Sequence, residues 1–428
     1  MTASFGLLDY VVFVAYALLI LGVGLWVSRD KKGHEKSAED YFLAGKSLPW
    51  WAIGASLIAA NISAEQFIGM SGSGFASGLA IASYEWMAAL TLIIVGKYFL
   101  PVFIEKGLYT IPEFVEKRFS TNLKTILAVF WIALYVFVNL ASVLYLGALA
   151  LETIMGVPMI YGVAGLALFA AAYSLYGGLS AVAWTDVIQV VFLILGGLFT
   201  TYLALNTVSG GAGIFEGLSR VYEAVPERFA MILDESNPEY KNLPGLGVLV
   251  GGMWVANLYY WGFNQYIIQR TLAAKSLKES QKGILLAAFL KLLIPLIVVI
   301  PGIAAYVMVN DPEILASLGA EGLQNLPDAS QADKAYPWLL QFLPTGFKGV
   351  AFAALAAAIV SSLASMLNST ATIFTMDIYK QYINKNAGDR ATVTVGRISA
   401  AVALVIAAVM APLLGGIDQA FQFIQEYT

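Results

Sequence analysis

The chain of 428 residues contains no cysteine and a single histidine, His34. Without cysteine the protein has no disulfide bonds, iron–sulfur clusters or thiolate zinc sites. One histidine in a charged stretch leaves almost nothing for a histidine metal site or a Ser-His catalytic pair. Charged residues are scarce too, at 12% of the chain, against about 25% in ordinary soluble domains. Redox, zinc and catalytic-triad chemistry are therefore excluded.

What the sequence has instead is hydrophobic residues, which make up 59% of the chain. A single core stops growing near ~250–300 residues and still needs a polar surface around it, so most of this chain must be solvated by lipid. The net charge is only −4, and no arginine-rich tract alternates with aromatic residues. The composition therefore predicts a lipid bilayer as partner and no nucleic acid.

Ten stretches are long and apolar enough to cross a bilayer as helices, which takes about 20 residues each. They cover 9–28, 48–70, 78–100, 124–151, 159–176, 181–206, 244–268, 283–309, 346–379 and 392–416, and an eleventh begins near 417. None alternates in polarity as a barrel strand does. The first is followed by basic residues and has no cleavage pattern, which favours an anchor helix. We expect an all-α polytopic membrane protein that forms a single transmembrane domain over 1–428.

Basic residues divide unevenly between the two sets of alternate loops, with 18 on one side and five on the other. Cytoplasmic loops retain lysine and arginine. This asymmetry predicts an external N-terminus, with external loops at 207–243 and 310–345. The acids of these loops are expected to be solvated.

Polar residues interrupt the second span, where Glu65 and Gln66 follow Asn61 and Ser63. Such a run favours a broken helix, because unwound backbone inside a membrane survives only around an enclosed cavity, where its carbonyl groups can hold a cation. The alternative is a polar patch between packed helices.

The 23 basic residues assigned to loops leave one of the 24, Lys291, which falls inside the apolar run 283–309. An unpaired ammonium group in hydrocarbon is costly, so Lys291 must face the interior and find an acceptor. The candidates are Glu65 and Glu85, and the sequence does not choose between them. A purely structural ion pair is the alternative, and Glu85 could also lie at the membrane interface.

Two further patterns combine polar groups on one helical face. Asn257, Tyr260, Trp261 and Asn264 follow the i, i+3, i+4, i+7 spacing. Amides bind hydroxyl groups and aromatic rings stack on apolar C–H faces, so this stripe indicates either a ligand wall or packing.

The second pattern joins Ala358 to Ser361 and Ser362, which offer neutral oxygen ligands suited to Na⁺. Serines also hold membrane helices together, so this set alone does not decide. Asp186 lies near one end of its span, as a step on a cation route or as an interfacial acid.

Several motifs in one order resemble the sodium/solute symporter family, and its bacterial sodium/sugar branch in particular. These are Asp40–Lys46 before Trp50-Trp51, Ala59–Gly69, Tyr176–Ser180 with Trp184-Thr185-Asp186, Gln269-Arg270, and Ile359–Ser365. The resemblance implies a leucine-transporter-type fold with inverted five-helix repeats. One extra helix at 9–28 would precede a first repeat at 48–206 and a second, C-terminally incomplete repeat at 244–428, and broken helices would lead both repeats.

The resemblance also implies site residues. Those that would bind the sugar are Gln66, Glu85, Asn257, Lys291, Gln425 and Tyr260. Tyr260 would close the pocket from the cytoplasm, and Met70, Tyr84 and Phe421 would close it externally. Sodium would be held by carbonyl groups of Ala59, Ile62 and Ala358 and by hydroxyls of Ser361 and Ser362, with Asp186 on the exit route.

The implied function is sodium-driven symport of a neutral hexose, galactose or glucose, across a bacterial inner membrane by alternating access. Na⁺ would be the co-transported ion, and neither an organic cofactor nor an enzymatic activity is expected. A position that matches a sugar-contacting serine in the family is Ala88 here, which puts the preferred ring hydroxyls in question. The alternatives are sodium-coupled uptake of another polar solute, such as myo-inositol, proline or a sialic acid, and a sugar sensor that does not transport.

Overall fold

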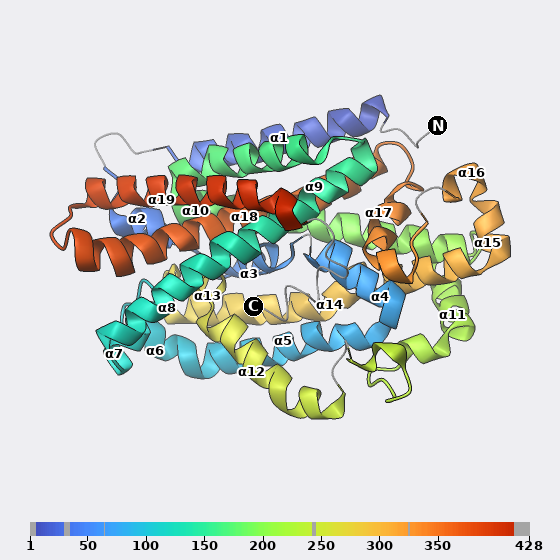
Figure 1. Cartoon of the computed structure of the whole chain (residues 1–428), viewed down its shortest axis with the longest axis horizontal. Helices are drawn as coiled ribbons and strands as arrows, with labels where there is room; N and C mark the ends of the chain where they lie inside the picture. The colour runs from blue at the N-terminus through green and yellow to red at the C-terminus, as the bar shows by residue number, and fades with distance from the viewer. Residues whose placement is uncertain (1–5, 30–34, 64, 242–244, 324–325, 415–428) are drawn as a thin grey trace.

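The computed structural model describes residues 6–29, 35–63, 65–241, 245–323 and 326–414. Within these ranges the secondary structure is helical, apart from one isolated bridge between Leu48 and Ala274. The all-α fold is confirmed. The helices lie roughly along the long axis of the molecule (Figure 1).

The main helices are, in chain order, α1 (Leu7–Val27), α3 (Trp50–Asn61), α5 (Ser83–Ile94), α7 (Ile111–Arg118), α8 (Thr121–Ala133), α9 (Ala141–Met155), α10 (Met159–Val208), α11 (Ile214–Ala224), α13 (Gln265–Leu272), α14 (Leu277–Asn310), α18 (Phe347–Ile373) and α19 (Asp389–Met410). Shorter helices are α2 (Ala38–Leu43), α4 (Ser71–Ser77), α6 (Leu100–Glu105), α12 (Met253–Leu258), α15 (Pro312–Ser317), α16 (Gly319–Gly322) and α17 (Ala335–Leu340). Wider π-helical turns extend several of them, at η2 (Glu65–Met70), η4 (Val95–Phe99), η5 (Leu134–Leu140), η8 (Val248–Gly252), η9 (Tyr259–Phe263) and η11 (Phe374–Ile383).

Seven helices of the described residues are long and apolar enough to span a bilayer. The longest, α10, is two helices joined at Gly178, whose φ of 63° lies in the left-handed region. Side chains disfavour that region, and a Cβ at Gly178 would also lie 2.3 Å from the Tyr41 carbonyl oxygen. The predicted spans 159–176 and 181–206 are therefore both present. The predicted spans 48–70 and 244–268 are missing from the seven because both are broken.

Small residues bring α10 and α18 together at the centre of the bundle. A Cβ added to Gly196 of α10 would lie 2.6 Å from the Cβ of Ala354 on α18. Close backbone approach through alanine, glycine and serine is how helices associate in lipid, where no hydrophobic effect drives them together. The span that contains α18 is 94% buried, whereas that of α1 is only 17% buried.

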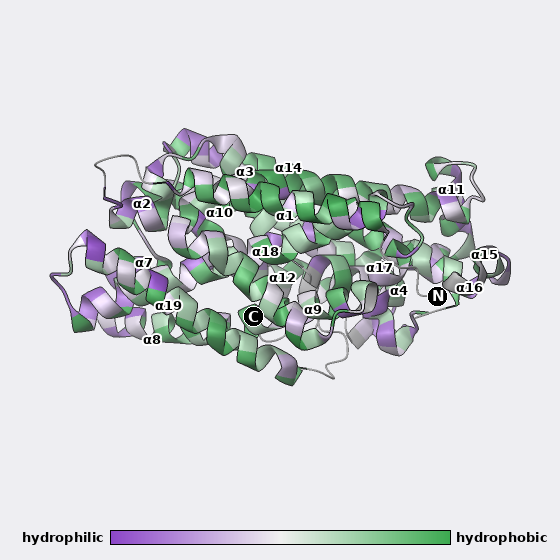
Figure 2. Cartoon of the chain, turned by 90° about the horizontal axis from the view of Figure 1, so that it is seen from above, coloured by the Kyte–Doolittle hydropathy of each residue, from purple (hydrophilic) through white to green (hydrophobic). Residues whose placement is uncertain are grey.

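Polar and apolar residues separate along the molecule. Figure 2 shows hydrophobic colours through the middle and hydrophilic colours towards the two ends. The segments α2 and α7 lie at one end, and α11, α15 and α16 lie at the other, near the start of α1 (Figure 1). The Asp9 carboxylate of α1 accepts hydrogen bonds from the amides of Gly346 and Gly349, 2.7 and 2.8 Å away. The loops that the sequence assigned to one side therefore share one end of the bundle.

Candidate functional site

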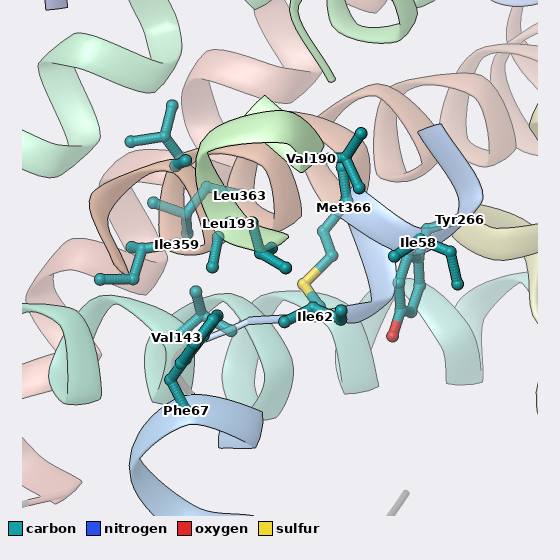
Figure 3. Packing of buried hydrophobic residues seen from close by; sticks show 14 of the residues in the cluster. Ile58, Ile62, Phe67, Val143, Val190, Leu193, Tyr266, Ile359, Leu363 and Met366 are labelled. Atoms are coloured by element: carbon teal, nitrogen blue, oxygen red, sulfur yellow. The ribbon is translucent and has the colours of Figure 1, made fainter. Parts of the chain in front are cut away.

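The first broken helix is held open by Gln66. The backbone leaves the helical region at Ile62, with φ −78° and ψ 100°, directly after α3. The amide of Ser63 then donates to Oε1 of Gln66, 3.1 Å away, and the Gln66 amide donates to the Ser63 carbonyl. Neither amide donates to the carbonyl four residues before it, so the carbonyl groups of Ala59 and Ile62 leave the regular helical ladder. The predicted break is confirmed; in Figure 3 Ile62 and Phe67 lie on its two sides.

The second broken helix changes direction at Asn264, whose ψ of 122° separates η9 from α13. The hydroxyl of Tyr135 donates to Oδ1 of Asn264 at 2.5 Å and accepts from the amide of Gln265 at 3.1 Å. The four residues predicted as one stripe therefore do not share a regular helical face. Asn264 ends the helix, and Asn257 donates its side-chain amide to the Met253 carbonyl of its own helix.

Tyr260 connects the two broken helices. Its hydroxyl accepts a hydrogen bond from Nδ2 of Asn61 at 2.8 Å and also contacts the Tyr266 hydroxyl. Asn61 is the last residue of α3, and Tyr266 belongs to the first turn of α13. A side chain on η9 thus joins both breaks.

Lys291 on α14 pairs with Glu85 on α5 through Nζ and Oε2. Both side chains are buried within the bundle, so Glu85 is not exposed on its surface. The ammonium nitrogen also lies 5.0 Å from the ring centre of Trp261, within the range of a cation–π interaction. The structure therefore selects Glu85 as the partner of Lys291. The side chain of Glu65 lies outside what the structure describes.

The predicted external gate is only partly described. Met70 ends η2 and is fully buried, and Tyr84 is partly buried at the start of α5. Phe421 and Gln425 lie outside the described residues. Ala88, one turn after Glu85, is buried on the same helix.

The two adjacent serines of α18 face different partners. Ser361 donates to Oδ1 of Asp186 at 2.5 Å, and Ser362 donates to the carbonyl of Ala60 at 2.9 Å. Ser362 therefore contacts α3 at Ala60, next to Ala59 and one residue before the helix ends at Asn61. Asp186 is fully buried and is therefore not an exposed acid at the surface of the bundle. Oxygen atoms from α3, α10 and α18 lie close together here. Oxygen ligands that carry together no formal charge or a single negative charge suit a monovalent cation.

Arg270 and Ser56 complete this region, and the sequence did not predict either role. Nε of Arg270 donates to Ser56 Oγ at 2.7 Å, and Ser56 donates to Oδ2 of Asp186 at 2.5 Å. The Arg270 guanidinium lies 3.6 Å from the same carboxylate oxygen and also contacts Ser365 and the carbonyl of Tyr266. Arg270 was one of the 18 basic residues assigned to the cytoplasmic loops, and that assignment was wrong, since it is fully buried. The signal available was its place in the Gln269-Arg270 motif.

The chain resembles sodium-coupled transporters over nearly its whole length. The family model described as the sodium:solute symporter family matches residues 41–426. A sodium/glucose cotransporter of Vibrio parahaemolyticus is 73% identical over 98% of this chain and 78% of that protein. Sodium/myo-inositol cotransporter 2 of Homo sapiens is 34% identical over 97% of this chain, which spans 63% of that longer relative.

Two solved structures are similar in fold. A Na⁺-coupled sialic acid symporter, in a substrate-bound outward-open state, superposes with a TM-score of 0.83 at 25% identity, covering 96% of this chain and 83% of that one. A nucleobase-cation-symport-1 family transporter gives a TM-score of 0.50 at 17% identity, covering 91% and 77%, and so supports the fold alone.

Proposed function

Because the chain belongs to the sodium:solute symporter family, it is a sodium-coupled transporter and not an enzyme, and we propose that its solute is a neutral hexose, glucose or galactose. The fold is the leucine-transporter type with one additional N-terminal helix. The observation that carries the proposal is the buried Lys291–Glu85 pair beside Trp261, a pairing of donor, acceptor and aromatic face that suits a polyhydroxylated ring.

The sugar would lie between the two broken helices. Gln66, Glu85, Asn257, Lys291 and Gln425 are proposed to bind its hydroxyl groups, with Tyr260 stacked below the ring. An acidic side chain in the lining disfavours a carboxylate solute, so Glu85 argues against a sialic acid. The 73% identity to a sodium/glucose cotransporter supports a hexose more than myo-inositol, whose named relative is 34% identical.

The sodium ion would lie where α3 breaks beside α18. We assign its ligands to the carbonyls of Ala59, Ile62 and Ala358 and to the hydroxyls of Ser361 and Ser362. Two of these carbonyls are released from the helical ladder by the Gln66 cap, and that release supports the assignment. Asp186 already bonds to Ser361, so it is placed to receive the ion on its way out.

Transport would proceed by alternating access between two inverted repeats, 48–206 and 244–428. With the Asn61–Tyr260 contact in place, ligands would bind from the external side. Met70, Tyr84 and Phe421 would then cover the sugar, the Tyr260 contact would open, and both ligands would leave inward. The uneven distribution of basic residues supports an external N-terminus, and the similarity to a bacterial cotransporter supports an inner membrane.

The available energy is sufficient for uphill uptake. One charge moving through about 100 mV releases about 2.3 kcal/mol, and a roughly tenfold sodium gradient adds about 1.4 kcal/mol. With one ion per sugar this supports roughly 500-fold accumulation. No organic cofactor is needed for such a process.

The proposal is tested with purified protein in proteoliposomes under an imposed sodium gradient. Labelled glucose or galactose is expected to accumulate with inward Na⁺ and not with inward K⁺. A competition panel of hexoses, myo-inositol, proline and a sialic acid then ranks the solutes. Strongest competition by myo-inositol would replace the hexose assignment, and binding without accumulation would identify a sensor.

A further inference from the structure

Three buried side chains near Asp186 carry polar atoms that have no hydrogen-bond partner within the described residues. They are the hydroxyls of Tyr16 on α1 and Tyr173 on α10, and both Oε1 and Nε2 of Gln189 on α10. At most 3% of any of these residues is exposed. Buried polar groups are nearly always bonded, to protein or to ordered water, because an orphaned donor or acceptor is destabilising. Four such atoms in one place therefore require a common explanation.

The three side chains lie close together, with Tyr16 on α1 and Tyr173 and Gln189 on the two halves of α10, before and after Gly178. The hydroxyl of Tyr16 lies within hydrogen-bonding reach of Gln189, and that of Tyr173 lies within reach of Gln189 and Thr185. The charge of Asp186 acts on both tyrosines, and that of Arg270 acts on Tyr173. None of these contacts among the two tyrosines and Gln189 meets hydrogen-bond geometry. The helices are nevertheless tightly packed nearby, since a Cβ at Gly24 of α1 would lie 2.8 Å from the Cβ of Tyr173. The polar atoms thus face one another without touching.

Water is the ligand that this set of atoms fits. A buried water typically makes about three hydrogen bonds and both donates and accepts, and Gln189 offers one group of each kind. A cation at the same point would leave Nε2 of Gln189 without an acceptor. The chemistry therefore favours water over a second ion.

We propose that Tyr16, Tyr173 and Gln189 bind an internal water beside Asp186, and that a cation leaving the serines of α18 takes up its first water there. The role in transport rests on the proposed sodium-coupled function. Gln189 follows Asp186 by three residues, so their side chains share one face of α10. Asp186 in turn bonds to Ser361. The site thus adjoins the ion's assigned ligands without including any of them.

Cysteine labelling tests whether water reaches this point. The natural chain has no cysteine, so Gln189→Cys creates a unique thiol. Its matched control is Val190→Cys, because Val190 is the next residue and is buried in the apolar core (Figure 3). During sodium-driven uptake, a small water-soluble thiol reagent is expected to modify the Gln189→Cys variant at least tenfold faster than the control. Equal rates would overturn the water site.

A second measurement separates release of the ion from its binding. Gln189→Leu removes the partners of the water and keeps the side-chain volume nearly constant. Its maximal uptake rate is expected to fall at least fivefold, while the external sodium concentration for half-maximal uptake stays within twofold of wild type. The control is Gln341→Leu, since Gln341 also has a buried unpaired Nε2 but follows α17 near the other end of the bundle.

Other outcomes contradict one proposal and not both. A wild-type rate in Gln189→Leu would remove the role in release. A large rise in the sodium requirement would make Gln189 a cation ligand and overturn the assignment of water. If the wild-type protein shows no sodium-driven uptake, the proposed function fails, and thiol labelling without a gradient still reports whether water reaches Gln189.

Discussion

Two of the buried pairs of opposite charge, Arg270–Asp186 and Lys291–Glu85, differ in how fully their polar atoms are engaged. Arg270 contacts Asp186, two serine hydroxyls and one backbone carbonyl. Lys291 contacts the Glu85 carboxylate and the face of Trp261. An ammonium group has three donors, so the lysine pair retains bonding capacity that the arginine pair has already used.

This difference indicates different tasks for the two pairs. A pair with spare donors and acceptors can bind a hydroxylated solute without first breaking its own contacts. A pair embedded among serines cannot, and the Arg270 network instead joins α3, α10, α13 and α18. We therefore expect the arginine pair to hold the helices around the cation site and the lysine pair to bind substrate.

Removal of Arg270 is expected to have the largest effect. Arg270→Ala leaves the buried Asp186 carboxylate without its cation, and breaking a buried pair in this way costs about 3–5 kcal/mol. The protein should unfold at a much lower temperature in detergent, as measured by intrinsic fluorescence. The control is Arg220→Ala, which breaks an exposed pair with Glu216 on α11 and should change stability by under about 1 kcal/mol. Equal melting temperatures for the two variants would contradict a structural role for Arg270.

Lys291→Met is expected to weaken sugar binding strongly and to impair folding less. Sugar affinity should fall at least 100-fold, or about 2.7 kcal/mol, as measured by equilibrium binding. The double variant Lys291→Met with Glu85→Gln removes both charges and should recover the melting temperature without recovering sugar binding. Wild-type affinity in the double variant would show that the pair is only structural, which would erase the contrast with Arg270.

Ser361→Ala tests the boundary between the arginine network and the cation site. The loss of one neutral oxygen ligand should raise the sodium concentration for half-maximal uptake about tenfold, since about 1.4 kcal/mol corresponds to a factor of ten. Sugar affinity at saturating sodium should change much less. Ser369→Ala is a suitable control, because Ser369 lies further along α18 and donates to Gln269. An unchanged sodium requirement would move the cation site away from this helix.

The sequence predicted the helices and the first break because these depend on local composition, whereas the second break was implied only by the resemblance to the symporter family. The run from Asn61 to Gln66 is too polar for a regular span, and the helix ends at Asn61. The sequence also limited the possible partners of Lys291 to two acids. The choice of Glu85, 206 residues away, depends on how α5 and α14 pack, and that is not encoded in any local pattern.

The Arg270 network was missed for a related reason. A basic residue that follows an apolar run is usually assigned to a loop. Arg270 instead lies on the short buried helix α13, which places it between α3 and α18. Gln66 makes a structural contact that the sequence did not predict. It was predicted as a sugar ligand, and its carbonyl oxygen here caps the break in α3. Its part in binding the solute remains a prediction.

The smallest expected effect concerns solute selectivity beside the lysine pair. Ala88 follows Glu85 by three residues on α5 and is 2% exposed, so a serine there would direct a hydroxyl to the same face. Ala88→Ser should change the relative competition by glucose and galactose two- to fivefold, within the range of one neutral hydrogen bond. Ala89→Ser, the neighbouring buried alanine on a different face of the helix, is the matched control. Identical rankings for both variants and the wild type would place the solute away from α5, and Lys291 would then have to bind it from the opposite side.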